Sequence, residues 1–402
     1  MILDVLPLEL MREVLLDLPT VDIIQTVKCT LRLYHFAKVD KALGRRLQNR
    51  VFDLTLFLNS YDHCRVCEDP VLQLFLETDF RPESDAVNHW NLNYNAFFFR
   101  LKGGCKCRND DDQMQEISSQ EIEPGLLDHP SYLYDKHLLR GFGSKTKFVI
   151  NNDSLDEAII NCGKLFNIFM KFCVIRSLGL TFFDSADHLW GKMNAFFNAN
   201  PPDVRIQPCV SINSEINLDN FLTGHIFSNG LAEIEISKGF GPFLTANPYH
   251  EVLRRTPSVS FEEIDLPYTY KDLVGFFKDT KKLSLHSATR ITKKQIRRLV
   301  QHFYEVQHDE ECMFEIEINE EVRIKDLLTL IPKKAYKLHP KKRRGMDPVP
   351  EMLIWAEMTD KFGGRWAMID MALYYGWVAS SNLFRICSMN ALHEDQPSDL
   401  IF

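Results

Sequence analysis

The sequence of 402 residues lacks the features that would place it in a membrane or on a secretory route. It has no run of about eighteen apolar residues, so we expect no membrane-spanning helix and no membrane partner. Its first residues contain no basic stretch followed by a long apolar one, so we expect no secretory signal. The ten cysteines should therefore be mainly free thiols in a reducing compartment, which is the cytoplasm, the nucleus or both.

Other classes of protein are excluded by composition. Gly and Pro, at 18 residues each, are too few for a collagen-like or linker-dominated chain. The formal net charge of -8 argues against a protein that coats nucleic acid, so we do not expect a nucleic-acid partner. The hydrophobic fraction of 45% is ordinary for a folded protein, and the length predicts more than one domain.

Motifs of catalysis are absent as well. The sequence has no Gly-x-Ser-x-Gly elbow and no His-Glu-x-x-His. The segment from Gly141 to Thr146 resembles a phosphate-binding loop, but Ser144 separates Gly143 from Lys145 and no strand is expected before it. We therefore expect a protein that is not an enzyme and needs no cofactor.

One group of cysteines resembles a metal site. Two close pairs, Cys64 with Cys67 and Cys105 with Cys107, would supply four thiolates to zinc. The second pair has one intervening residue and the loop between the pairs is long, so the alternative is four ordinary thiols.

The N-terminal segment has the apolar spacing of an amphipathic helix. Apolar side chains recur at steps of three and four residues, at Leu10, Met11, Val14, Leu15 and Leu18. Pro7 suits the first turn of this helix, and Pro19 ends it. A second helix is expected to begin near Asp22, whose carboxylate would cap it. About forty residues rarely bury enough surface to fold alone, so the segment should dock onto the rest of the chain or onto a partner.

In order and spacing, this segment resembles an F-box. Leu6-Pro7 is followed twelve positions later by Leu18-Pro19, then by Asp22-Ile23-Ile24, Val27 and Cys29. The tryptophan usual a few residues after the cysteine is absent. In that family the segment is a three-helix unit that binds the Skp adaptor and, through it, a cullin-based ubiquitin ligase. The resemblance implies that this chain is a substrate-recognition adaptor of such a ligase, and that the rest of the chain binds an unknown target protein.

The resemblance also assigns individual positions. Those expected to face the Skp adaptor or to pack behind that surface are Leu6, Pro7, Leu10, Val14, Leu15, Leu18, Pro19, Ile23, Ile24 and Val27. The alternative is a plain helical hairpin that caps a larger domain, in a repeat-type binding scaffold that belongs to no ligase.

Short strand-like runs recur along the body of the chain. They begin about 22 to 31 residues apart, a spacing near that of leucine-rich repeats, and lie at residues 147–150, 174–182, 204–212, 231–236, 259–266, 282–286 and 313–318. Helical patterns lie between them, one of them capped by Thr292. We expect an α/β fold in which a divergent solenoid, similar to leucine-rich repeats, follows the F-box; a non-repetitive α/β domain is the alternative.

These patterns predict four parts of the chain. They are an F-box at 1–48, a connecting region with an acidic loop at 49–146, the α/β body at 147–332, and a basic connection with a helical C-terminal cap at 333–402. The helices of the cap are expected around Trp355, Trp366 and Trp377.

Alternation along the strands predicts which side chains leave the core. The carboxylates on the outward positions are those of Glu233, Glu235, Glu262, Glu315 and Glu317. They are either solvated strand residues, kept charged for solubility, or a binding site for a basic segment of the target.

A compact basic cluster, Lys341-Lys342-Arg343-Arg344, is either a nuclear-import signal or a solvated loop. Together with the cysteine pairs, it leaves a nuclear regulator with a small zinc site as a further alternative.

Overall fold

The computed structural model describes residues 6–47, 51–59, 71–78, 93–102, 118–134, 138, 146–183, 187–213, 221–237, 251–262, 273–274, 280–286, 291–307, 312–318, 320, 322–340, 353–370 and 382–389. The chain divides into two compact units. Unit 1 comprises Met1–Val210, Ser214–Ile216 and Asn220–Asn229, and unit 2 comprises Ser211–Asn213, Asn217–Asp219 and Gly230–Phe402. The boundary expected between residues 146 and 147 lies inside unit 1.

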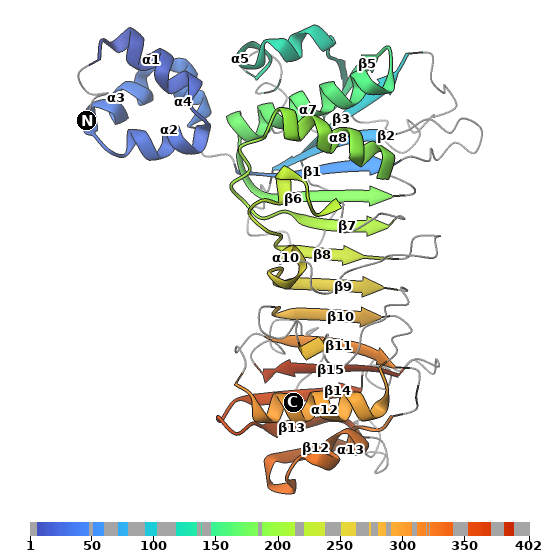
Figure 1. Ribbon diagram of the computed structural model, residues 1–402. Helices are drawn as coiled ribbons and strands as arrows, with labels where there is room; N and C mark the ends of the chain where they lie inside the picture. Colours follow the sequence, from blue (N-terminus) through green and yellow to red (C-terminus); the bar gives the residue numbers. More distant parts are fainter. Residues whose placement is uncertain are drawn as a thin grey trace. The chain divides into compact units, whose positions relative to one another are not determined.

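Unit 1 begins with four short helices and continues with a mixed sheet and its covering helices (Figure 1). The helices of the N-terminal segment are α1 (Leu8–Asp17), α2 (Thr20–Val27), α3 (Leu31–Val39) and α4 (Lys41–Arg46). The strands are β1 (Val51–Asn59), β2 (Val71–Thr78), β3 (Asn93–Leu101), β4 (Ser118–Glu121), β5 (Thr146–Asn152) and β6 (Val174–Phe183). The remaining helices are η3 (Pro124–Asp128), α5 (Pro130–Leu133), α7 (Leu155–Phe172), α8 (Asp187–Ala199) and η5 (His225–Phe227). Strand β7 (Cys209–Asn213) has residues in both units.

The sheet of unit 1 combines both kinds of strand pairing. Strand β1 pairs in parallel with β6 and antiparallel with β2, which pairs antiparallel with β3. Strand β5 then pairs in parallel with both β3 and β4. Helix α7 packs on β2, β3 and β5, where Phe97 stacks on Phe148 at 4.7 Å between ring centroids and contacts Phe169 at 5.1 Å. The core of unit 1 therefore lies between this sheet and α7.

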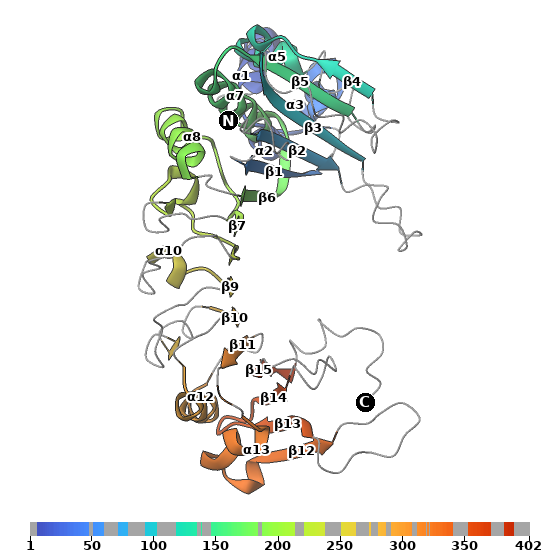
Figure 2. The same ribbon diagram turned by 90° about the vertical axis from the view of Figure 1, so that its right-hand side faces the viewer.

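Unit 2 begins with four parallel strands in sequence order, β8 (Glu233–Ile236), β9 (Ser258–Glu262), β10 (Lys282–His286) and β11 (Met313–Ile318). Figure 2 views them nearly end-on, with α10 (Glu251–Arg254) and α12 (Lys293–Glu305) on one side. Further helical turns are α13 (Ile324–Leu327), η6 (Leu328–Leu330) and η7 (Lys333–Ala335). Phe303 of α12 contacts Phe314 of β11 at 5.2 Å, so the helix side carries the core. The protein is thus mixed α/β, as the sequence predicted.

The predicted helical cap at the C-terminus is wrong. Residues there form strands β12 (Tyr336–Pro340), β13 (Leu353–Thr359), β14 (Arg365–Asp370) and β15 (Asn382–Ser388), all paired antiparallel, and β15 also pairs antiparallel with β11. Trp355 lies in β13 and Trp366 in β14, whereas Trp377 lies outside the described residues.

A tight turn explains why β13 and β14 form a hairpin. The Oδ1 of Asp360 accepts hydrogen bonds from the backbone N–H groups of Phe362 and Gly364, each at 2.8 Å. Its Oδ2 accepts from the indole Nε1 of Trp366 at 2.9 Å. Gly363 has a φ of 91°, which a side chain would strain. The turn reverses the chain within five residues, and the two strands then pair.

None of the described helices combines the length and the apolar character that crossing a bilayer requires.

Candidate functional site

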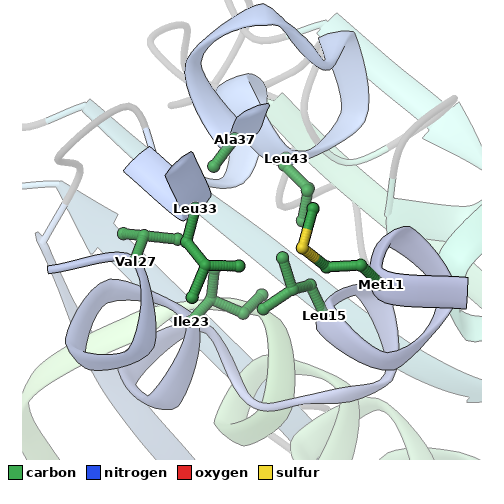
Figure 3. Close-up of a cluster of buried hydrophobic side chains, with 7 residues drawn as sticks. All are labelled: Met11, Leu15, Ile23, Val27, Leu33, Ala37 and Leu43. Atoms are coloured by element: carbon green, nitrogen blue, oxygen red, sulfur yellow. The ribbon is translucent and has the colours of Figure 1, made fainter. Parts of the chain in front are cut away.

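The four N-terminal helices enclose a small core of their own (Figure 3). Its buried side chains are Met11, Leu15, Ile23, Val27, Leu33, Ala37 and Leu43. Thr30 caps α3 by accepting a hydrogen bond from the amide of Leu33 at 3.2 Å. Asp40 caps α4 by accepting from the amides of Ala42 and Leu43, both at 3.0 Å. Local caps and this core together order the segment from residue 6 to residue 47, which we call the helical unit.

The helical unit also has large apolar side chains that are exposed to solvent. They are Leu8, Leu10, Val14, Leu31, Tyr34 and Val39, with exposed fractions from 41% to 82%. Leu10 and Val14 are one turn apart on the same side of α1, and we call this pair the α1 strip. Single exposed apolar side chains are ordinary, but six on a unit of about forty residues are more than isolated exposure accounts for.

The structure divides the ten positions that the F-box resemblance assigns. Buried in the core are Leu15, Ile23 and Val27. Partly buried are Leu6, Leu18, Pro19 and Ile24, of which Leu6 and Leu18 pack against the core. Exposed are Pro7, Leu10 and Val14. Sequence reasoning missed Leu8 and Val39 as exposed apolar residues; their position off the buried stripe of their helices was the available signal.

Contacts within unit 1 attach the helical unit to the end of α7. Thr20 Oγ1 donates to the carbonyl oxygen of Phe172 at 2.8 Å. The buried Arg46 donates from Nε to Thr20 Oγ1 at 3.2 Å, and from its two terminal nitrogens to the carbonyls of Leu16 and Leu18 at 2.7 Å each. Its guanidinium carbon also lies 4.6 Å from the centroid of the Phe172 ring. One side chain therefore joins the end of α1, the start of α2 and the end of α7.

Two ion pairs add to this attachment. Lys171 Nζ lies 2.9 Å from Asp17 Oδ1, and Arg205 binds both carboxylate oxygens of Asp22. The hydrogen bonds from Arg205 hold the pKa of Asp22 below its usual range. The predicted capping role of Asp22 is wrong, since α2 begins at Thr20 with Pro19 at its N-cap position.

A polar pocket of about 230 Å³ lies in unit 2, over β8, β9, β10, β11 and β15. Ile234, Val259, Leu283 and Phe314 are fully buried, so the alternate side chains of these strands face the opposite side of the sheet. Strand register sets those side chains in rows. One row contains Glu235, Ser260, Ser284, Glu315 and Arg385, and the row beside it contains Glu233, Ser258, Lys282 and Met313. His286 stands next to Glu262 in a third row.

Glu315 is buried in this pocket, contrary to the expectation of an outward carboxylate available to a partner. It pairs with Arg385 of β15, and its Oε2 lies 3.0 Å from Nε2 of His286. Burial raises the pKa of Glu315, but the hydrogen bond from His286 and the charge of Arg385 outweigh it and lower the pKa to about 2. The hydrogen bond with Glu315 in turn raises the pKa of His286, against the effect of burial. The charge of Glu315 is therefore neutralised inside the protein.

The other carboxylates of the pocket are less well balanced. Glu233 accepts a hydrogen bond from Ser258 Oγ at 2.9 Å, and Glu262 Oε1 lies 3.9 Å from His286 Nδ1. In the part of the chain that the structure describes, Glu235 has no hydrogen-bond or ion-pair partner. Burial, together with the negative charges of Glu262 and Glu233, raises its pKa. We call Glu233, Glu235 and Glu262 the acidic trio; besides the cations that pair with Glu315, the pocket lining sets one Lys, Lys282, against these three carboxylates.

Comparison with known proteins gives no match. The chain matches no protein-family model, no curated protein and no solved structure. The assignment of its function therefore depends on the residues and contacts described above.

Several predicted features lie outside the described residues. They are the cysteine pairs Cys64 with Cys67 and Cys105 with Cys107, and the basic cluster at 341–344. Among the residues that the structure does describe, no group of three or more His, Cys, Asp or Glu side chains is placed to hold a metal ion. The buried thiols of Cys162 and Cys173 have pKa values raised by burial, so they are inert rather than reactive.

Proposed function

We propose that this chain is a substrate-recognition adaptor of a Skp-cullin-F-box ubiquitin ligase. Its helical unit binds the Skp adaptor, and unit 2 binds the target protein through the polar pocket. The chain acts by holding the target near the ubiquitin-charged enzyme, which raises the local concentration of target lysines there, and it makes or breaks no bond itself.

The observation that carries this proposal is the exposed apolar surface of the helical unit. A unit of about forty residues needs nearly all of its apolar side chains to build a core. This one nevertheless keeps the α1 strip, Leu31 and Tyr34 in water while its core is closed by other residues. Apolar side chains in such positions lower the free energy of a complex when a partner covers them.

The attachment of the helical unit supports an adaptor role. Arg46 and Thr20 join the unit to α7 by hydrogen bonds that are buried or partly buried. A target is presented more effectively by a stiff connection than by a flexible one, because the effective concentration at the enzyme falls as the connection loosens.

The parallel strands of unit 2 support the target-binding part of the proposal. Each of β9, β10 and β11 adds beside the strand before it, so the chain builds a repeat-like surface on the side away from α12. The acidic trio lies on that surface, and clustered carboxylates attract a basic segment while they repel an acidic one. Glu315 takes no part, because Arg385 and His286 already balance its charge.

The Skp-binding proposal is tested by placing charge on the α1 strip. The double variant Leu10→Asp with Val14→Asp should lose capture of a purified Skp adaptor by at least about tenfold, since losing a central interface contact costs about 2 kcal/mol or more. Both side chains are exposed, so the fold should be retained. Capture is measured by surface plasmon resonance.

The matched control is Glu13→Gln, an exposed change on the same helix. It should bind as the unchanged protein does. Unchanged capture by the Leu10 and Val14 double variant, with circular dichroism showing a retained fold, would remove the Skp-binding proposal.

The target-binding part has its own test, with a fluorescent decalysine peptide as the probe. Glu235→Gln with Glu262→Gln should weaken its binding, and added salt should weaken binding to the unchanged protein. Binding that is indifferent to both salt and the substitutions would refute the role of the acidic trio and leave the Skp-binding proposal untouched.

A further inference from the structure

The helical unit contains a hollow that the proposed function does not use. It has a volume of about 550 Å³ and lies between α1, α3 and α4. Its lining includes Arg12, Phe36, Val39, Lys41 and Arg45. Pockets of this size are large enough to take one or two side chains of a ligand.

The hollow and the α1 strip are separate surfaces. On α1, Arg12 is about 160° around the helix axis from both Leu10 and Val14. The α1 strip and Arg12 therefore face opposite sides of α1, so the hollow is not part of the α1 strip.

Two of the side chains that line the hollow are large and apolar, Phe36 and Val39. Phe36 is partly buried and packs against the core of the helical unit. Val39 is 82% exposed, which is the largest exposure among the large apolar side chains of the described residues. Covering these two side chains with an apolar group of a ligand would remove apolar surface from water, which favours binding.

The rim of the hollow is cationic. Arg12 Nε donates to Asp40 Oδ2 at 2.7 Å, and the caps of Ala42 and Leu43 also use that carboxylate. Lys41 and Arg45 are four residues apart on α4, and neither has an ion-pair partner among the residues that the structure describes. Like charges at this spacing repel each other by a few tenths of a kcal/mol, a cost that an anionic ligand would offset.

The charge of the rim is opposite to that of the whole protein. The lining contains three cationic side chains and one carboxylate, whereas the formal net charge of the chain is -8. A ligand selected by this hollow must therefore supply negative charge beside an apolar group.

We infer that the hollow is a docking site for an acidic segment of another protein, one that carries a large apolar side chain among its carboxylates. The apolar side chain covers Phe36 and Val39. Flanking carboxylates pair with Lys41 and Arg45, and Arg12 offers the N–H groups that Asp40 leaves unused. This site goes beyond the proposed function, because it lies apart from both the α1 strip and the polar pocket of unit 2.

The test uses a fluorescein-labelled peptide of about twelve residues, with a central Phe flanked by Glu on both sides. Its binding to the full chain is measured by fluorescence anisotropy. Lys41→Glu with Arg45→Glu should weaken binding by at least about tenfold, and so should Val39→Asp. Salt should weaken binding to the unchanged protein.

Matched controls separate the hollow from the general charge of the protein. Lys28→Glu with Lys294→Glu makes the same change in net charge at exposed positions elsewhere, and should leave binding unchanged. A peptide with Gln in place of Glu, and one with Ala in place of Phe, should each bind weakly.

Several results would overturn the inference. One is equal binding of the Gln peptide, or of the Lys41 and Arg45 double variant. Displacement of the peptide by inorganic phosphate at millimolar concentration would mean that the hollow takes any small anion. Self-association of the unchanged chain in sedimentation velocity, lost in the double variant, would assign the hollow to a second copy of this chain.

Discussion

Arg46 should hold the helical unit in place, and its replacement by Ala tests this directly. The substitution removes three hydrogen bonds from a charged donor and the contact with the Phe172 ring. Hydrogen bonds to charged groups contribute about 1.5–3 kcal/mol each, and a partly desolvated cation–π contact about 1 kcal/mol. These contributions are not additive, because all of them depend on one side chain. We therefore expect a loss of about 3–5 kcal/mol in the stability of the helical unit.

Hydrogen exchange measured by mass spectrometry is the suitable assay. With two compact units, a single free energy of unfolding for the whole chain is not well defined. Exchange reports the local opening of α1 to α4 separately from that of α12. The expected loss corresponds to a fall in protection of the helical unit by a factor of about 10² to 10⁴, with α12 unchanged.

Two variants serve as controls. Arg45→Ala removes an exposed neighbour on the same helix and should change protection little. Arg46→Lys keeps the charge but lacks the guanidinium fork, so it should fall between the two. If Arg46→Ala protects α1 to α4 as well as Arg45→Ala does, Arg46 does not hold the helical unit and the reasoning is refuted.

The remaining predictions concern helix packing and pH. Gly163→Ala should destabilise unit 1 by about 1–3 kcal/mol, because its new Cβ would lie 2.4 Å from the Phe196 ring. Gly191→Ala, on an open helix surface, should instead stabilise unit 1 by up to about 1 kcal/mol. Thermal melts compare the two variants. The pairing that raises the pKa of His286 stabilises unit 2 below the ordinary pKa of histidine and is lost as pH rises through the raised value. The stability difference between the unchanged protein and His286→Gln should therefore shrink as pH rises above about 6.5, and a constant difference would contradict it. The lowered pKa of Glu315 has the opposite sign: its contribution is present above about pH 4.5 and is lost as pH falls toward its folded pKa of about 2, a loss that acid titration of unfolding should show.

Local patterns predicted several of the helices and strands, but not α7 or α8 of unit 1. The apolar stripe of residues 10 to 18 is α1, and the helix that Thr292 was expected to cap is α12, with Thr292 and Gln295 forming a capping box. The strand-like runs at 282–286 and 313–318 are β10 and β11. These elements were predictable because their signals, a cap and a period, lie within a few residues of each other.

The C-terminal strands were missed because their signal is ambiguous. Strand β14 runs Arg-Trp-Ala-Met-Ile-Asp, and its four central residues are all buried. A strand with both faces covered shows no alternation, and a short apolar run of this kind suits a buried helix equally well. Gly363-Gly364 was the available sign of a turn, and Asp360 supplies the hydrogen bonds that close it.

The burial of Glu315 shows the limit of what side-chain alternation along a strand can predict about function. Period two correctly gave its direction, since Phe314 and Ile316 on either side are buried in the core. The direction of a side chain does not fix its exposure, because the neighbouring strand can cover it. Here β15 pairs with β11 and places Arg385, 70 residues further along the chain, opposite Glu315. Of the five predicted carboxylates, Glu233, Glu235 and Glu262 form the acidic trio and Glu315 belongs to the neutral buried network. Glu317 is half-buried opposite Leu383 of β15 and does not line the pocket. A charge reversal at Glu315 would break that network and confuse loss of folding with loss of binding, so the trio, and Glu235 above all, is the informative place to change the charge of this surface.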